Sequence, residues 1–168
     1  MSGNCAPGRQ VAREYWDTCL FIAFLQNRAD ERELVDIVAA RLKKAEEGEN
    51  LIVVSTLVLA EIRPRSAYDT ERAEVIRDLF YTNRPFIRMV ALSPRIADVA
   101  SLIGADHNAL TAPDAVHVAT AWSERVDVLL TNDGKADRER RRSGELLFYD
   151  RRIGKPSLRI ERPTAQIE

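Results

Sequence analysis

The stretch LTAPDAVHVATAWSERVDVLLTNDG, residues 110–134, decides the fold that the sequence predicts. It reads as a helix that leads directly into a buried strand, whose apolar residues are Val126, Val128, Leu129 and Leu130. One carboxylate stands at each end of this unit, with Asp114 in the first helical turn and Asp133 after the strand. Because ligands bind at the carboxyl ends of strands in open parallel sheets, we expect the functional edge where this strand ends.

A strand followed at once by an acid also occurs near the N-terminus. Residues 14–16 end a short strand, and Asp17 and Thr18 then precede the apolar helical run CLFIAFL. Either Asp17 or Thr18 can cap this helix by accepting a hydrogen bond from a free amide at its start. Asp17 therefore has a structural explanation as well as a functional one.

The third acid of this kind is Glu61. LIVVS, residues 51–55, has the β-branched composition of a buried strand, and the short helical segment TLVLAEI follows it. A carboxylate among apolar neighbours is costly to bury unless it has a partner. The structural alternative is that Glu61 faces solvent or pairs with Arg63 or Arg65.

The remaining segments alternate in the same way. We expect helices over residues 30–47, from Asp69 or Thr70 onward, and from Ser93-Pro94 to Gly104, and strands in PFIRMVAL, LLFYD and SLRIE. Thr111 and Asp114 have the spacing of a capping box, which is the structural alternative for Asp114. The Asp-Gly turn signal is the structural alternative for Asp133. This alternation predicts an α/β fold with a mainly parallel sheet.

The four acids, taken together, predict a metal site. In a right-handed parallel sheet the strand-to-helix junctions fall on one edge, so Asp17, Glu61 and Asp133 should converge there, and Asp114 joins them from the start of a helix. Converging carboxylates repel one another unless a cation lies between them. Carboxylate oxygens without a set of His and Cys ligands favour Mg²⁺ or Mn²⁺.

A carboxylate-bound Mg²⁺ suits hydrolysis of a phosphodiester, because it can orient a water molecule and neutralise phosphate charge. The chain has no glycine- and lysine-containing P-loop, which disfavours phosphate transfer from a nucleotide. A haloacid-dehalogenase type of phosphatase would need an acid where Cys19 stands. A receiver domain would need an early pair of acids, and Glu14 is too near the start of its strand to supply one.

The composition, with 45% hydrophobic and 30% charged residues, is that of a globular protein. We expect a single domain over residues 1–168, with an N-terminal arm over 1–13 and a basic C-terminal segment over 135–168 that carries the last strand. No apolar run is long enough to span a membrane, and the N-terminus lacks the apolar core of a signal peptide, so we expect a cytoplasmic protein. Cys5 and Cys19 are expected to be reduced thiols.

The C-terminal segment is the most basic part of the chain. Residues 135–168 contain ten Lys or Arg and six Asp or Glu, an excess of four positive charges. A basic patch beside an acidic site suits a polyanionic substrate, and we take Arg138, Arg140, Arg141 and Arg142 as candidate residues for binding it, RNA if the family resemblance given below holds. The alternative is a solvated surface segment.

Asp17-Thr18, Glu61 within STLVLAEI, Asp114 within APDAVHVATA, and Thr131-Asn132-Asp133 occur in an order that resembles the PIN-domain family. The resemblance covers most of the chain and is nearest to the VapC-type toxins of toxin–antitoxin pairs. It implies a PIN-like, Rossmann-like three-layer α/β/α sandwich with a five-stranded parallel sheet. It also implies an Mg²⁺- or Mn²⁺-dependent endoribonuclease that forms homodimers and is inhibited by a small antitoxin.

By this resemblance, Asp17, Glu61, Asp114 and Asp133 are the catalytic, metal-binding acids. Thr18 and Thr131 would support them, and Asp137 would be an accessory acid, although the aromatic residue that often follows the last acid is absent here. Two alternatives stay open: a non-catalytic PIN module that binds RNA or protein, and a stand-alone nuclease without an antitoxin.

Overall fold

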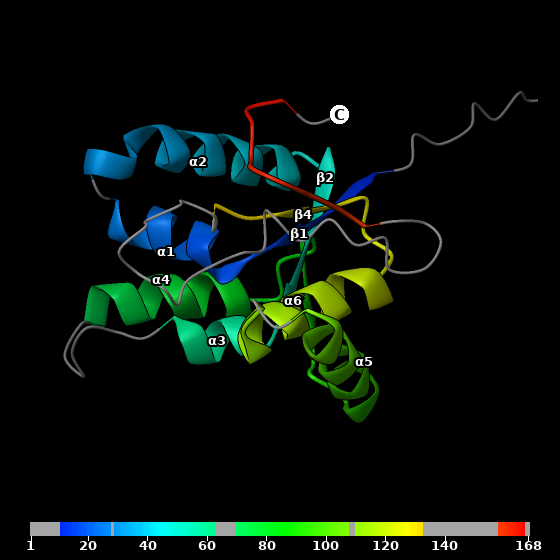
Figure 1. Ribbon diagram of the computed structural model, residues 1–168. Helices are drawn as coiled ribbons and strands as arrows, with labels where there is room; N and C mark the ends of the chain where they lie inside the picture. The colour runs from blue at the N-terminus through cyan, green and yellow to red at the C-terminus, as the bar shows by residue number, and fades with distance from the viewer. Residues whose placement is uncertain (1–10, 28, 63–69, 108–109, 133–157, 167–168) are drawn as a thin grey trace, which may run out of the picture.

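The computed structural model describes residues 11–27, 29–62, 70–107, 110–132 and 158–166 (Figure 1). Its strands are β1 Ala12–Trp16, β2 Asn50–Ser55, β3 Ile87–Val90, β4 Val128–Leu130 and β5 Arg159–Glu161. They form one sheet in the order β3-β2-β1-β4-β5, and each neighbouring pair is parallel. The predicted α/β fold with a five-stranded parallel sheet is therefore confirmed.

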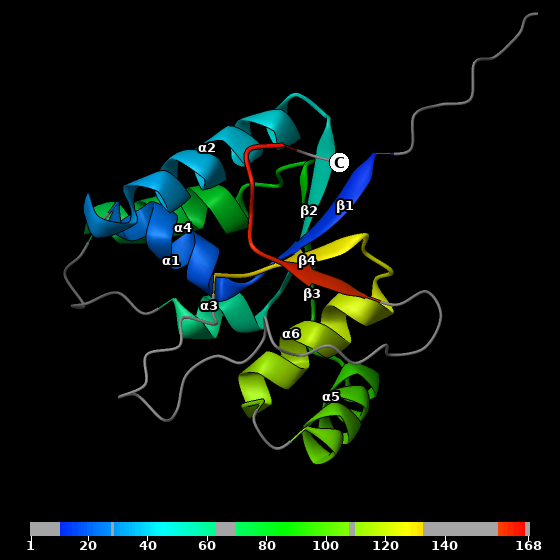
Figure 2. The ribbon, with the colours of Figure 1, turned by 45° about the horizontal axis from the view of Figure 1, so that its top comes forward.

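Helices cover both faces of this sheet (Figures 1 and 2). They are α1 Thr18–Gln26, α2 Arg32–Glu46, α3 Leu57–Glu61, α4 Thr70–Tyr81, α5 Pro94–Asp106 and α6 Ala112–Ser123, with a 3₁₀ turn, η1, over Ala29–Glu31. Residues of α1 to α4 share one buried cluster with the sheet, and residues of α5 and α6 share another. The predicted three-layer sandwich is confirmed by these two cores.

The strands divide their side chains between the two cores by simple alternation. Tyr15 and Leu129 lie in the core under α5 and α6, whereas their neighbours Trp16 and Leu130 lie in the opposite core. Successive side chains of a strand point to opposite faces, so a strand covered on both faces needs apolar residues at nearly every position. This requirement explains the unbroken apolar runs that marked β2 and β4 in the sequence.

Most helix boundaries follow their sequence signals, with one exception. Ser93 caps α5 by accepting a hydrogen bond from the Ile96 amide at 3.3 Å, as predicted. The predicted end of α5 at Gly104 is wrong, because the helix continues to Asp106 and the His107 amide still donates to the Ile103 carbonyl at 3.1 Å. The buried side chain of Ile103 holds this turn in place, and that packing outweighs the weak helix propensity of glycine, which is about 1 kcal/mol.

Two of the remaining predictions concern the C-terminal half. The predicted strand SLRIE contains β5, which pairs with β4 at the edge of the sheet. The predicted strand LLFYD, residues 146–150, lies outside the described residues.

Within the described part of the chain, no helix is both long and apolar enough to cross a membrane.

A buried ion pair joins the sheet to α2. Glu14 of β1 is 2% exposed and pairs with Arg41 of α2, which is 5% exposed. The other carboxylate oxygen of Glu14 accepts hydrogen bonds from Trp16 Nε1 at 3.0 Å and Asn50 Nδ2 at 3.2 Å. Such a pair is tolerated in a core only when further hydrogen bonds compensate for the lost water.

The same arginine holds the described end of the chain. The Arg41 guanidinium donates to the carbonyl oxygens of Thr164 and Gln166, and Lys44 Nζ donates to the Ala165 carbonyl at 3.1 Å. Figure 2 shows this segment, in red, returning from β5 across the sheet to α2. Arg41 therefore points inward from α2 and joins the helix, the sheet and this segment.

We expect replacement of Arg41 by Met to lower the free energy of unfolding by about 3–5 kcal/mol, because Glu14 is then buried without its cation. The double replacement Arg41→Met with Glu14→Gln removes both charges and should recover part of this loss. Urea denaturation measures both variants. Arg32→Ala, which breaks an exposed ion pair with Asp36, is the control and should change stability by less than about 0.5 kcal/mol. An equally small effect of Arg41→Met would contradict the proposed weight of the buried pair.

Candidate active site

The strand order reverses between β1 and β4. The chain runs from β1 outward to β2 and β3, then crosses to the other side of β1 to form β4. In open α/β sheets, ligands bind where the strand order reverses in this way, at the carboxyl ends of the strands. Here those ends carry Asp17 after β1 and Thr131 after β4, and the Asp17 amide donates to the Leu130 carbonyl at 3.0 Å.

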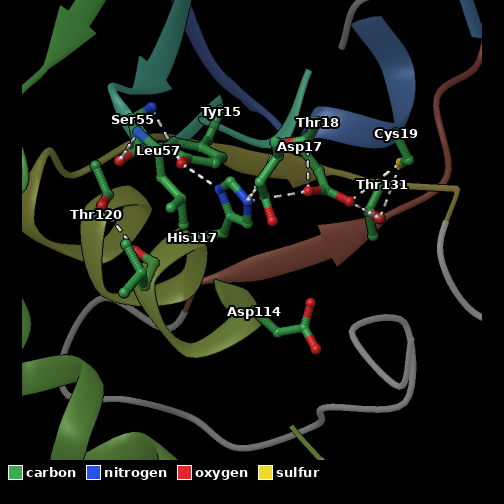
Figure 3. Close-up of polar contacts among 12 residues, drawn as sticks. Tyr15, Asp17, Thr18, Cys19, Ser55, Leu57, Asp114, His117, Thr120 and Thr131 are labelled. Carbon is green, nitrogen blue, oxygen red and sulfur yellow. Dashed lines mark hydrogen bonds and ion pairs between the residues drawn. The ribbon is translucent and has the colours of Figure 1, made fainter. Parts of the chain in front are cut away.

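Asp17 is held by hydrogen bonds to both carboxylate oxygens (Figure 3). It is the N-cap of α1, with Oδ1 accepting from the Thr18 amide at 2.7 Å. Oδ2 accepts from the Thr131 hydroxyl at 2.7 Å and from the Cys19 thiol at 3.1 Å. The Asp17 carboxylate therefore caps α1 through Oδ1, as predicted, and contacts Thr131 through Oδ2.

Cys19 takes part in this arrangement as a thiol. Burial and the nearby charge of Asp17 raise the pKa of Cys19, so its sulfur keeps its proton. The Asn132 amide donates to the same sulfur at 3.2 Å and brings the end of β4 against the start of α1. The Cys19 sulfur is thus engaged by the Asp17 carboxylate and by the Asn132 amide.

Glu61 reaches the same edge from the last residue of α3. Its Oε2 accepts a hydrogen bond from the Thr18 hydroxyl and lies 2.9 Å from His117 Nε2. Burial alone would raise the pKa of Glu61, but these two hydrogen bonds outweigh burial and lower it. Glu61 is therefore an anion held by Thr18 and His117, and not the solvent-facing carboxylate of the structural alternative.

His117 lies among the acids and is 1% exposed. Its Nε2 is 2.9 Å from Glu61 Oε2 and 3.5 Å from Asp17 Oδ1, and its Nδ1 is 2.7 Å from the Tyr15 hydroxyl. Burial favours the neutral ring, yet the hydrogen bond to Glu61 and the charges of Asp17, Glu61 and Asp114 together raise the pKa of His117. Three of the predicted acids therefore act on one imidazole.

Asp114 combines a structural contact with a place at this edge. The predicted capping box is confirmed: Asp114 Oδ2 accepts from the Thr111 amide at 2.9 Å, and the Thr111 hydroxyl accepts from the Asp114 amide at 3.4 Å. Helix α6 leads into β4, so its first turn begins near the carboxyl ends of the strands. Figure 3 shows the Asp114 carboxylate extending from that first turn on the side of Asp17 and Thr131.

The fourth acid and its neighbours are not placed. Asp133 and Asp137 lie outside the described residues, as do the basic residues Arg138, Arg140, Arg141 and Arg142. The described chain reaches Asn132, whose amide is already at the site through Cys19. The roles given to these residues stay predictions.

The donor chemistry of the site fits a hard divalent cation. Its charged groups are carboxylates, its thiol is protonated, and its one imidazole is already engaged at both nitrogens. As the described side chains stand, no three His, Cys, Asp or Glu residues are arranged to hold one ion. Asp17, Glu61 and Asp114 are the residues at this edge whose carboxylate oxygens could hold such an ion.

Sequence reasoning gave too little weight to His117 and did not consider Tyr15. His117 is three residues after Asp114, which places both on one side of α6, but a histidine at this spacing is more often a surface or supporting residue. Tyr15 looked like an ordinary core residue of a strand. Only the packing of β1 against α6 reveals that its hydroxyl meets the imidazole.

The comparisons with known proteins agree with this fold. The family model described as PIN domain matches residues 15–141. Similar solved structures include VapBC2 from Rickettsia felis bound to a DNA fragment from its promoter, with 16% identity, a TM-score of 0.59, and coverage of 90% of this chain and 99% of that one. DNA-bound VapBC from Salmonella typhimurium has 16% identity, a TM-score of 0.59, and coverage of 90% and 98%.

A toxin–antitoxin complex from Klebsiella pneumoniae is also similar, with 22% identity, a TM-score of 0.52, and coverage of 73% of this chain and 88% of that chain. No curated protein sequence matches the chain. At these identities the solved structures establish a shared fold, and the family match covers the segment that contains the four predicted acids.

We expect the metal-free chain to lose stability as the pH rises above 6.5, the ordinary pKa of histidine. The folded pKa of His117 is raised, so its contribution is complete below the unfolded pKa and is lost as the pH rises through the folded pKa. His117→Gln, which cannot titrate, should lack this alkaline loss. Urea denaturation at a series of pH values measures the slope, and identical slopes in both proteins would contradict the assignment.

Proposed function

Because the chain belongs to the PIN domain family, we propose that it is a metal-dependent endoribonuclease. The family consists generally of nucleases that hydrolyse phosphodiester bonds. The observation that carries the proposal is the gathering of Asp17, Glu61 and Asp114 around one buried imidazole at the strand crossover. A non-catalytic module does not need several carboxylates at one edge of the sheet. A bound cation, in contrast, offsets the repulsion between them.

In this proposal Asp17, Glu61, Asp114 and Asp133 hold Mg²⁺ or Mn²⁺. The bound ion would orient a water molecule, lower its pKa and neutralise charge on the scissile phosphate. Thr131 and Thr18 orient the carboxylates, since Thr131 donates to Asp17 and Thr18 donates to Glu61. The N-terminus of α1 also orients Asp17, since the Thr18 amide donates to its Oδ1.

We further propose that the chain is the toxin of a toxin–antitoxin pair. The support is the fold shared with VapBC complexes over 90% of the chain and nearly the whole length of two of those proteins. A small antitoxin would then bind and inhibit the nuclease, and the toxin itself would form a homodimer. A small open reading frame for a DNA-binding antitoxin next to the gene would favour this proposal over a stand-alone nuclease.

The alternative function is a non-catalytic PIN module that binds RNA or protein. Such a module has no need to retain its acids, yet Asp17 and Glu61 are both ionisable groups fixed by dedicated hydrogen bonds. Titration with Mn²⁺ separates the two functions. A nuclease should bind the ion and lose it in Asp17→Asn, whereas a scaffold should be indifferent to both.

We expect the purified protein to cleave RNA only when Mg²⁺ or Mn²⁺ is present, and Asp17→Asn to lower kcat/KM by about 100-fold or more. Asparagine keeps the oxygen that caps α1, so the variant should fold. Cleavage of a labelled RNA, with and without EDTA, measures the effect. Asp36→Asn, which changes an exposed acid on α2, is the control and should be fully active. Undiminished cleavage in EDTA or by Asp114→Asn would exclude the proposal.

A second prediction concerns the basic segment. Changing Arg140, Arg141 and Arg142 to Ala should weaken RNA binding and flatten its dependence on salt, because each phosphate contact contributes to the slope. Fluorescence anisotropy with a labelled RNA at several salt concentrations measures the slope.

The matched control for this segment removes three positive charges from exposed positions on α2 and β3, with Arg32, Lys43 and Arg88 changed to Ala. It should leave the slope nearly unchanged. An equal slope in the wild type and in the triple variant at 140–142 would place the basic segment away from the substrate.

A further inference from the structure

A continuous chain of buried hydrogen bonds runs from the main chain of β2 to the site (Figure 3). The Ser55 amide donates to the Tyr15 hydroxyl at 3.2 Å, and that hydroxyl lies 2.7 Å from His117 Nδ1. The other ring nitrogen of His117 lies 2.9 Å from Glu61 Oε2. Tyr15 is fully buried and His117 is 1% exposed, so water does not compete for the contact between the phenol and the imidazole.

We propose that His117 is a positioning residue that fixes the Glu61 carboxylate beside Asp17, and that Tyr15 holds the imidazole in the orientation this requires. This inference rests on the proposed function, since it gives the fixed carboxylate its purpose. Such partners of metal-binding groups commonly determine how well a site holds its ion. His117 does not touch substrate in this role and acts through Glu61 and Asp17.

The surroundings of the ring determine which nitrogen carries the proton. Nε2 faces Glu61 Oε2 at 2.9 Å, Asp17 Oδ1 at 3.5 Å and the Thr18 hydroxyl at 3.4 Å. A nitrogen lone pair in that position would be repelled by two carboxylates, so Nε2 carries a hydrogen and donates. This holds for both the neutral and the charged ring.

On the other side of the ring, Nδ1 accepts from Tyr15 when the ring is neutral. The Ser55 amide already donates to the phenol oxygen, which leaves the Tyr15 O–H free to donate to Nδ1. Both ring nitrogens are thus engaged by protein groups, which argues against His117 as a metal ligand.

Glu61 needs this support because its own helix is weak. It is the last residue of α3, which has five residues, and a helix of this length does not hold itself together in water. Its side chain is 27% exposed, and its Oε2 shares His117 Nε2 with Asp17 Oδ1. Without His117, only the Thr18 hydroxyl would oppose the electrostatic repulsion between the two acids.

The first test measures Mn²⁺ affinity by isothermal titration calorimetry on the full chain. His117→Leu removes both hydrogen bonds, and we expect it to weaken Mn²⁺ binding by about 10–100-fold. His117→Gln retains an N–H donor and should recover most of the affinity, and Tyr15→Phe, which only frees the ring, should lose a few-fold. Val118→Ala is the control, because it opens a cavity in the same buried helix next to His117 without touching an acid.

A purely structural role for His117 gives a different result. His117→Leu and Val118→Ala would then both lower the melting temperature and leave Mn²⁺ affinity at the wild-type value, which would overturn the inference. If His117→Leu does not fold, His117→Gln and Tyr15→Phe still decide it. If His117→Gln recovers most of the Mn²⁺ affinity and Tyr15→Phe loses part of it, the positioning role is supported. If Tyr15→Phe keeps the wild-type affinity and His117→Gln loses Mn²⁺ binding, the positioning role is contradicted.

The second test does not depend on metal or activity. Long-range ¹H–¹⁵N spectra of the metal-free protein at alkaline pH report which nitrogen of neutral His117 is protonated, and we expect Nε2–H with Nδ1 bare. A protonated Nδ1 would overturn the inference even in an active enzyme. If the wild type does not bind Mn²⁺, the proposed nuclease is refuted, but a spectrum with Nε2–H still confirms the hydrogen-bond chain. The failure of the proposed function and the failure of this inference are therefore distinguishable.

Discussion

The repulsion between carboxylates that the fold brings to one edge of the sheet is the constraint on which the rest of the site depends. Asp17 is anchored to the end of β4 through Thr131, and Glu61 is anchored to α1 through Thr18. His117 stands between these two acids and offers its Nε2 to both. Each of these contacts brings a donor to a carboxylate oxygen, and together they hold the two acids on either side of one imidazole.

The topology makes this gathering possible, because the strand order reverses beside β1. The first residue after β1 and the first after β4 then meet at the carboxyl edge, where Asp17 receives the Thr131 hydroxyl. The opposite half of β1 is held differently, by the buried pair of Glu14 and Arg41. The acid in the core is thus paired with an arginine, whereas the acid after the strand is held by an amide, a hydroxyl and a thiol.

The sequence was sufficient to predict those features that depend on residues close together along the chain. The caps at Ser93 and Thr111, and the strand-to-helix junction at Asp17, depend on residues a few positions apart, and the structure has them as predicted. It was insufficient where the partner is distant along the chain. The pairing of Tyr15 with His117, 102 residues apart, is set by packing across the sheet and leaves no pattern in either segment.

The central claim is that distant acids form one oxygen-rich site for a hard cation. Anomalous diffraction from crystals of the protein soaked in Mn²⁺ tests it most directly. The account predicts an anomalous peak at the carboxyl ends of β1 and β4, with carboxylate oxygens of Asp17 and at least one of Glu61, Asp114 and Asp133 about 2.1 Å from the ion or joined to it through water. Soaked crystals without a peak at that edge, or with Mn²⁺ bound only elsewhere on the surface, would contradict it.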